Sequence, residues 1–308
     1  MKQFDVIGFG ALNVDKLFHV NAIAHAEEER FVKNFTEAAG GSAANTIAGL
    51  ARLNCRTGFI GKTAEDREGK LLIDDFIKEG VDLNGIIHSK KGRTGTVMGY
   101  VDEKGQRALY VDPGVNDSIE PQEVDQTYAS NTKFLHLTSF VGKKSFRTQK
   151  RILEKIPREV KVTLDPGTLY AEKGMEQLEP IVKRSFAVLP NARELEALTG
   201  KSDYCRGAEY LLEVGVKIVA VKLGKDGCYV TDGTTSCVVR PFDVKVVNTT
   251  GAGDAFCAGF LYGIIKGKNI EECGRIGNFV ASRCVMKTGA RVGLPTEADL
   301  KFLGQMLN

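Results

Sequence analysis

Short apolar runs and longer amphipathic stretches alternate along most of this chain. The apolar runs have the length and character of buried strands and lie near residues 4–10, 57–61, 134–137, 160–164 and 186–189. The stretches between them repeat apolar residues with the period of a helix, over residues 42–53, 66–79, 145–155 and 192–199. This order predicts an α/β fold in which helices cover both faces of a mostly parallel sheet.

The last third of the chain and two earlier segments depart from this alternation. Short strands joined by glycine-containing turns are expected in residues 216–222, 227–231 and 236–239, before helices over 252–266 and 270–287. Residues 15–35 and 93–111 resemble pairs of strands that leave the main sheet, and the second pair flanks the turn Asp102–Gly105. We expect these segments to form a small β lid on one domain spanning residues 1–308, because the sequence has no linker.

The charge balance and the cysteines exclude several classes of partner. Lys and Arg total 42 against 39 Asp and Glu, a net charge of +3, so no basic field argues for nucleic acid. Residues 38–51 form the longest stretch without a charge, which is shorter than the roughly 18 apolar residues of a membrane span. Asp5 interrupts the apolar region that a signal peptide would need. The 7 cysteines never form a CxxC pair, which is typical of reduced thiols in the cytoplasm.

Glycine is over-represented, with 34 of 308 residues, and three glycine-rich segments compete as nucleotide sites. Residues 8–13 follow a strand, but Asn13 stands at the third glycine position and strand-like residues follow, which disfavours a dehydrogenase. Residues 61–63 imitate the end of a phosphate-binding P-loop. The earlier glycine of that loop is replaced by Arg56, so a strand-end turn is the better interpretation.

The third segment, NTTGAGDAF at residues 248–256, leads directly into an apolar helix rich in small residues. Small residues leave the backbone amides at a helix start open to an anion. Asp254 lies in the first turn, where a carboxylate can take the proton of a hydroxyl that attacks phosphorus. Alternatively, Asp254 only complements the helix dipole.

Two other segments contain residues that could bind a ligand beside this third segment. In AGGSAAN at residues 39–45, Gly40 and Gly41 allow a ligand to approach the backbone, and Asn45 offers a donor and an acceptor to hydroxyls. The alternative is a turn in which neighbouring backbone satisfies Asn45. Asn191 and Glu194 open a later helix, where they are equally consistent with a simple capping box.

Taken together, these segments resemble the two signatures of the PfkB, or ribokinase-like, carbohydrate kinases. Their order and spacing match the family, as does the Asn191-x-x-Glu194 motif between them, and the resemblance covers essentially the whole chain. It implies a three-layer α/β/α fold with a small β lid. It also implies an enzyme that uses ATP and Mg²⁺ to phosphorylate a hydroxyl of a small sugar.

The resemblance implies roles for individual residues. Asp254 would be the catalytic base, and the amides of Gly251, Ala252 and Gly253 would stabilise charge on the transferred phosphoryl group. Asn191 and Glu194 would organise Mg²⁺, partly through water. The sugar would be bound by Asn13, Asp15, Gly40, Gly41 and Asn45. The nucleotide would be bound by Asn191, Lys222, Gly224, Gly227 and Asn278, with the loop around Gly289 bordering adenine.

One residue departs from the family pattern. Asn248 stands where many members have an aspartate that helps to hold a monovalent cation, which puts potassium activation in doubt. Lys222 has a simpler interpretation too, as an exposed lysine at the end of a strand.

The sequence does not determine the substrate. Arg107 and Tyr110 are candidates for recognising an acidic group, or else a solvated charge and a packed aromatic residue. A nucleoside competes with a sugar, because Phe18, Phe31 or Met98 in the lid could stack on a base. A sensor without activity is disfavoured, because it would not need a base at Asp254 or the Asn191–Glu194 motif. The resemblance also implies a homodimer formed through the lids.

Overall fold

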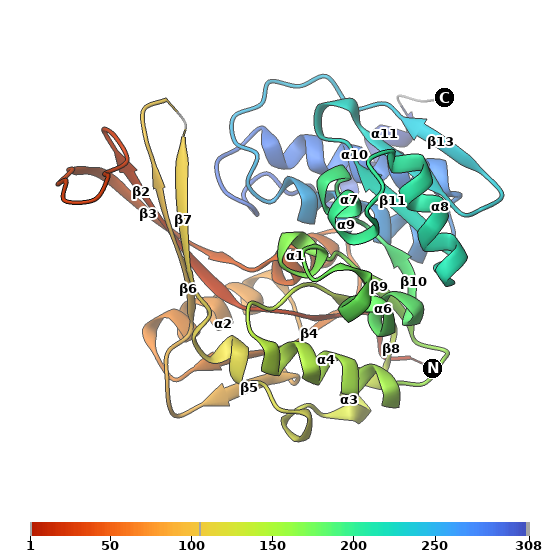
Figure 1. Ribbon diagram of the computed structural model, residues 1–308, viewed down its shortest axis with the longest axis horizontal. Helices are drawn as coiled ribbons and strands as arrows, with labels where there is room; N and C mark the ends of the chain where they lie inside the picture. The colour runs from red at the N-terminus through yellow and green to blue at the C-terminus, as the bar shows by residue number, and fades with distance from the viewer. Residues whose placement is uncertain (1, 105, 306–308) are drawn as a thin grey trace.

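The computed structural model describes residues 2–104 and 106–305 (Figure 1). Among these residues nine strands form the larger sheet, in the order β13-β12-β11-β10-β9-β8-β1-β4-β5. Neighbours from β5 to β11 pair in parallel, whereas β12 and β13 add antiparallel strands at one edge. The strands are β1 Phe4–Phe9, β4 Thr57–Ala64, β5 Ile86–Ser89, β8 Thr132–Leu137, β9 Lys161–Leu164, β10 Ser185–Val188, β11 Ile218–Lys222, β12 Cys228–Thr231 and β13 Ser236–Val239.

Helices cover both faces of this sheet and bury an apolar core on each. One core packs the sheet against α3 Gln126–Ser130, α4 Lys143–Lys155, α5 Gly167–Ala171, α6 Gly174–Arg184, α7 Ala192–Thr199 and α8 Tyr204–Val214. The cores on the other face involve α1 Ser42–Arg52, α2 Arg67–Glu79, α9 Ala252–Ile265 and α10 Ile270–Val285, with α11 Glu297–Gln305 following last in the chain. The fold is therefore the three-layer α/β/α arrangement expected from the sequence.

A smaller sheet projects from the main body (Figure 1). Within the described part of the chain it has four strands in the order β3-β2-β6-β7, which are β2 Asn13–Val20, β3 Val32–Gly40, β6 Gly95–Val101 and β7 Arg107–Asp112. The predicted strand pairs are present, but β2 begins at Asn13 and β3 continues to Gly40. Asn13, Asp15 and Gly40 consequently lie on strands of the small sheet, which hold them more rigidly than loops would.

Strand register assigns the side chains of the small sheet to two faces. Asn13 and Asp15 share one face, since side chains alternate along a strand. Lys16, Phe18, Met98 and Tyr110 belong to the opposite face, where Lys16 pairs with Glu68 of α2. We call this second surface the outer face.

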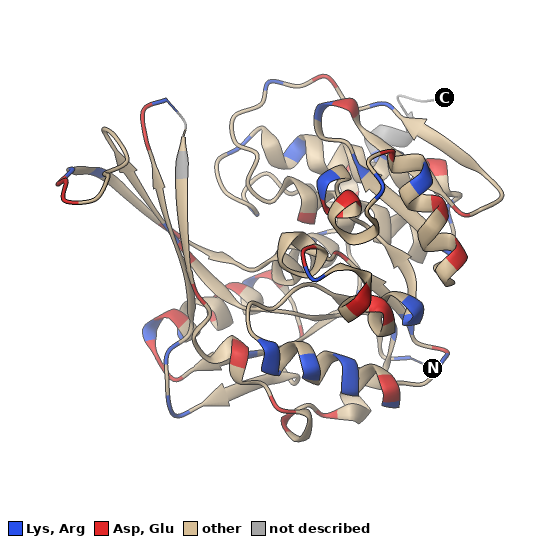
Figure 2. Ribbon diagram, viewed as in Figure 1, with Lys and Arg blue, Asp and Glu red and all other residues tan. Residues whose placement is uncertain are grey.

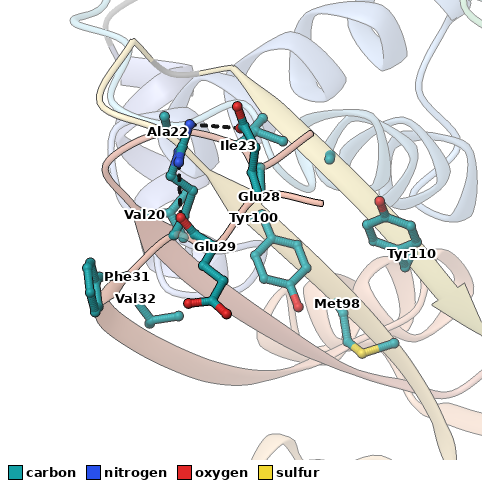
Figure 3. Close-up of a pocket in the computed structure, with 13 residues that line it drawn as sticks. Val20, Ala22, Ile23, Glu28, Glu29, Phe31, Val32, Met98, Tyr100 and Tyr110 are labelled. Carbon is teal, nitrogen blue, oxygen red and sulfur yellow. Dashed lines mark hydrogen bonds and ion pairs between the residues drawn. The ribbon is translucent and has the colours of Figure 1, made fainter. Parts of the chain in front are cut away.

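A cavity of about 710 Å³ lies on the outer face (Figure 3). The loop between β2 and β3 contributes Phe31 to its wall, and β6 and β7 contribute Met98, Tyr100 and Tyr110. Phe31 is 84% exposed and Tyr110 is 60% exposed. Large apolar side chains with this much exposure are typical of surfaces that meet another molecule.

The local sequence signals place most helices correctly. Asp66 caps α2 through the amide of Gly69, and α2 ends at Gly80, which adopts the left-handed conformation at φ 74°. The glycine-rich segment at Gly8 is followed by strand β2 and not by a helix, as expected when a dinucleotide site there was disfavoured. Strand β5 and helices α3, α5, α6, α8 and α11 were not predicted from the sequence; β5, α3 and α5 are only 4 or 5 residues long.

Charge is mixed over the helical layers (Figure 2). Basic residues predominate on α4, which carries Lys143, Lys144, Arg147, Lys150, Arg151 and Lys155. Among the residues that the structure describes, no helix combines the length and the apolar character needed to cross a bilayer.

Candidate active site

The two glycine-rich segments, more than 200 residues apart in the sequence, meet at the carboxylate of Asp254. Ser42 Oγ donates to Asp254 Oδ1 at 2.6 Å, and Asn45 Nδ2 donates to Asp254 Oδ2 at 2.8 Å. Thr46 Oγ1 also donates to the Asp254 carbonyl oxygen at 3.2 Å. The start of α1 therefore orients both oxygens of a carboxylate in the first turn of α9. An acid that served only the helix dipole would need none of these contacts.

The pKa of Asp254 is raised to about 6, chiefly because burial removes water from the carboxylate. The charge of Asp165 adds to this rise, whereas the hydrogen bonds from Ser42 and Asn45 and the charge of Lys222 oppose it. The carboxylate is thus mostly ionised at neutral pH, yet basic enough to accept a proton. This combination suits general-base chemistry.

The backbone at the start of α9 depends on glycine. Gly251 is the N-terminal cap at φ 78°, and a β-carbon there would lie 2.5 Å from the Ala290 Cβ. The first amides of a helix have no carbonyls of a preceding turn to bond, which leaves donors at this end. The Ala252 amide instead donates to the Thr249 carbonyl at 3.2 Å. Of the three expected amide donors, those of Gly251 and Gly253 are the better placed for an anion.

The expected sugar-binding residues surround the end of β3. Asp15 packs directly over Gly40, where any β-carbon would overlap its carboxylate. Gly41 has φ 102°, and a side chain there would meet the Ala11 carbonyl oxygen. Burial raises the pKa of Asp15 to about 6, and the positive charge of Arg291 opposes part of the rise.

Asn13 is oriented by a residue that the sequence analysis did not identify. Asn116 Nδ2 donates to Asn13 Oδ1 at 2.9 Å and to the Leu12 carbonyl oxygen at 2.8 Å. The Leu12 amide donates back to Asn116 Oδ1 at 2.9 Å. With its amide oxygen engaged, Asn13 has its amide group available as a donor.

Lys222 is buried beside the start of α9, so its interpretation as an exposed lysine is wrong. Its side chain is 12% exposed, and its Nζ lies 2.7 Å from Asp165 Oδ2. Burial acts to lower the pKa of Lys222, but neighbouring negative charge, above all that of Asp165, outweighs it and raises the pKa. A β-carbon on Gly253 would lie 3.5 Å from the Lys222 Nζ. A permanent positive charge therefore adjoins the glycine turn.

A cavity of about 620 Å³ adjoins the glycine turn, a size that suits a small molecule. It is lined by Lys222, Gly224, Gly227, Gly253 and Asn278, among others. These include four of the residues that the resemblance assigned to the nucleotide. Asn278 has a structural task as well, since its Nδ2 donates to the carbonyl oxygens of Val239 and Arg240 at 3.0 Å each.

Asn191 and Glu194 form the capping box that the sequence analysis left open. Asn191 Oδ1 accepts from the Glu194 amide, and Glu194 Oε2 accepts from the Asn191 amide, each at 2.8 Å. Asn191 also forms a backbone bridge with Lys222, which brings α7 to the nucleotide side. Burial raises the pKa of Glu194, and Lys222 opposes the rise. Capping occupies one carboxylate oxygen of Glu194 and leaves the other available.

Asn248 is oriented locally, because its Oδ1 accepts from the Thr250 amide at 2.8 Å. Across the residues that the structure describes, no group of three or more His, Cys, Asp or Glu side chains could hold a metal ion.

The residues suggested for stacking on a base do not face the substrate residues. Phe18 and Met98 belong to the outer face of the small sheet, opposite Asp15, because their register places them with Lys16. Phe31 lines the outer cavity, as does Tyr110. Within one chain, Phe18, Phe31, Met98 and Tyr110 therefore lie away from the residues expected to bind the sugar. The side chain of Arg107 lies outside the described part of the structure.

Four residues that contact the candidate site were not predicted from the sequence. Ser42 lies within the recognised AGGSAAN segment, and Asp165 follows a buried strand, so both carried a local signal. Asn116 and Arg291 carried none, because they reach the site from a 3₁₀ helix and a turn that are distant in the chain. Arg291 Nε donates to Asn45 Oδ1 at 2.8 Å across 246 positions.

Comparison with known proteins yields a family match over most of the chain. The family described as pfkB family carbohydrate kinase matches residues 5–297. A protein of Archaeoglobus fulgidus named as an uncharacterized sugar kinase is 50% identical over 254 residues, which are 82% of this chain and 100% of that protein. An ATP-dependent ribose-1-phosphate kinase of Halopiger xanaduensis is 32% identical over 97% of this chain and 98% of its own length.

A solved structure shares the fold along nearly its full length. The ribokinase of Arabidopsis thaliana, solved in complex with ribose and ATP, superposes with a TM-score of 0.86 at 26% identity. The match covers 97% of this chain and 98% of that one.

Proposed function

Because the chain belongs to the pfkB family of carbohydrate kinases, and is thus a phosphotransferase that acts on a hydroxyl group, we propose that it transfers the γ-phosphoryl group of ATP to a hydroxyl of a small sugar. Asp254 is the base in this proposal. The observation that carries it is the pair of hydrogen bonds from Ser42 and Asn45, which aim the Asp254 carboxylate from the first turn of α9.

In the proposed step, each charged or polar group of the site has one role. Asp254 takes the proton of the sugar hydroxyl, whose oxygen bonds to the γ-phosphorus as the bond to the ADP oxygen breaks. The amides of Gly251 and Gly253, and to a lesser extent that of Ala252, stabilise the charge on the transferred group. Lys222 adds a positive charge beside Gly253. Phosphoryl transfer consists largely of such positioning and electrostatic stabilisation.

Asn191 and Glu194 would suit Mg²⁺, because they present an amide and a carboxylate beside the proposed phosphate site. We assign its outer contacts to Asn191 and to the free carboxylate oxygen of Glu194, consistent with the reluctance of Mg²⁺ to lose its water shell. When bound, the ion neutralises phosphate charge. Asn248 supplies no carboxylate for a second, monovalent cation, so we assign no strong potassium site.

We favour a sugar over a nucleoside as the substrate. Asn13, Asp15 and Asn45 offer donors and acceptors suited to adjacent hydroxyls. The aromatic residues that would stack on a base belong to the outer face of the small sheet instead. The two relatives above are named for a sugar or a sugar phosphate. A sensor without activity remains disfavoured, because it would not need the oriented Asp254.

The remaining parts of the proposal concern the small sheet and the setting of the enzyme. We propose that the small sheet is a lid over the sugar and belongs to a single domain with the main sheet. The exposed apolar outer face would form the contact between the lids of a homodimer. The seven free cysteines suit a reducing cytoplasm.

An ADP-release assay tests this function. Pentoses, hexoses, sugar acids, ribose 1-phosphate and nucleosides are each supplied with ATP and Mg²⁺, and Asp254→Asn serves as the inactive control. Turnover with a sugar or sugar derivative that Asp254→Asn lacks supports the proposal. Turnover with nucleosides alone would show that the substrate is a nucleoside and not a sugar. Turnover by Asp254→Asn equal to that of the native chain would refute the proposed base.

A further inference from the structure

Arg291 is a buried cation behind the active site, in the loop that follows α10. Its Nε donates to Asn45 Oδ1 at 2.8 Å, and its Nη1 pairs with Asp75 of α2. The guanidinium also lies over the Phe76 ring, 5.5 Å from the centroid. These contacts fix the plane of the guanidinium between α1 and α2. The proposed phosphoryl transfer assigns no role to Arg291.

We propose that Arg291 is a positioning residue that fixes the amide of Asn45 in the one orientation that supports the base. An asparagine amide has an oxygen that accepts and a nitrogen that donates, and it can rotate to exchange them. A guanidinium only donates, so Arg291 compels the Asn45 oxygen to face it. The Asn45 nitrogen must then face Asp254, where its 2.8 Å hydrogen bond favours the ionised carboxylate. This inference rests on the proposed role of Asp254.

Loss of Arg291 would remove the constraint on this amide. In the rotated orientation, the Asn45 oxygen would face the Asp254 carboxylate, and two acceptors cannot share a hydrogen bond. Such an arrangement disfavours the charged form of Asp254 and raises its pKa. The other charges near Asp254 are those of Asp165 and Lys222, and neither depends on Arg291. The groups that face Arg291 itself are Asp75 and Glu79 of α2 and Asp15 of β2.

A role limited to stability does not account for this residue. The same loop is already tied to the helices by Arg52, which donates to the carbonyl oxygens of Arg291 and Leu294 and pairs with Glu79. Arg291 Nη2 is buried and has no hydrogen-bond partner among the described residues. Apolar side chains of similar volume often stabilise a fold as well as a buried ion pair does. The hydrogen bond to Asn45 is therefore the contribution of Arg291 that an apolar side chain could not replace.

The test compares Arg291→Met with Arg52→Met, which removes the arginine of α1 that ties down the same loop and leaves the Asn45 contact intact. For each variant, kcat and KM are measured from pH 5 to pH 9 with the sugar that the native chain phosphorylates. We expect Arg291→Met to lower kcat about 5-fold near pH 6, because a one-unit rise in the pKa of Asp254 reduces its ionised fraction by that factor. The acid limb of its profile should move up by about one pH unit, so that activity recovers at high pH. Arg52→Met should leave the acid limb in place.

A double-mutant cycle with Asn45→Ala separates orientation from packing, because Arg291→Met should then add little further loss of kcat. Equal effects of both arginine variants without a pH shift, or full additivity with Asn45→Ala, would overturn the inference. If Arg291→Met does not fold, Arg291→Gln decides, because a glutamine amide can donate or accept and no longer compels the orientation of Asn45. A shift of the acid limb in the same direction is expected, and an unshifted limb would contradict the inference. A native chain that phosphorylates no substrate would refute the proposed function instead.

Discussion

Ser42 Oγ lies 2.6 Å from Asp254 Oδ1, although 212 positions separate the two residues along the chain. Ser42 opens α1 and Asp254 lies in the first turn of α9, so the N-termini of two helices converge on one carboxylate. Both helix ends carry partial positive charge, which favours the ionised form of an acid between them.

The first prediction concerns the pH dependence of the reaction. Asp254 must be ionised to act as a base, and its pKa is about 6, so kcat should rise with pH through that value. Ser42→Ala removes a hydrogen bond that lowers this pKa, so the acid limb should move to higher pH. At pH 6 the variant should lose activity, and at pH 8 it should approach the native rate.

The control for this prediction is Thr46→Val, which removes a hydrogen bond to the Asp254 carbonyl rather than to the carboxylate. Its pH profile should match that of the native chain. A profile of Ser42→Ala that coincides with the native profile would contradict the assignment of the limb to Asp254.

The second prediction concerns the glycine turn before α9. Gly251→Ala places a side chain at φ 78° and against Ala290, so it should destabilise the fold by about 1–2 kcal/mol or more. Its kcat should fall as well, because the amides at the helix start move. Gly267→Ala is the matched control, since Gly267 has φ 72° and open space around it. Thermal unfolding should show a loss for both variants, and the kinetic loss should be confined to Gly251→Ala.

The third prediction concerns the buried pair of Lys222 and Asp165. Lys222→Met leaves a buried carboxylate unpaired, which should cost about 3–5 kcal/mol of folding free energy. The double variant Lys222→Met/Asp165→Asn should regain part of that stability and none of the activity, since the charge beside Gly253 is still absent. Lys225→Met, which changes another lysine of the same cavity, should leave stability close to native. Chemical denaturation and steady-state kinetics measure both effects, and recovery of activity in the double variant would contradict the role given to Lys222.

The fourth prediction concerns monovalent cations. Asn248 bonds to the Thr250 amide and brings no negative charge, so potassium should change kcat little. Asn248→Asp restores a carboxylate and should make the rate respond to potassium but not to choline. Strong activation of the native chain by potassium would contradict this account of Asn248.

The sequence predicted the parts of the site that are contiguous in the chain. The segments around Asn45 and Asp254 were identified because several functional residues stand together in each. Arg291 and Asn116 could not be found in this way, since they reach the site from distant segments of the chain and have no distinctive neighbours. The contact of Lys222 with Asp165 spans 57 positions, so burial reversed the simpler interpretation of that lysine. Faces of the small sheet depend on register, which is why Phe18 and Met98 were misplaced.

The most direct test of the account compares Asp254→Asn with Asp243→Asn, which changes an acid that lines the adjoining cavity. The turnover of each variant is measured by ADP release with the best sugar, and ATP affinity by calorimetry. We predict that Asp254→Asn lowers kcat by about 10²- to 10⁴-fold while ATP affinity stays near native, and that Asp243→Asn keeps most of its activity. A native kcat in Asp254→Asn would contradict the central claim that Asp254 is the base of a sugar kinase.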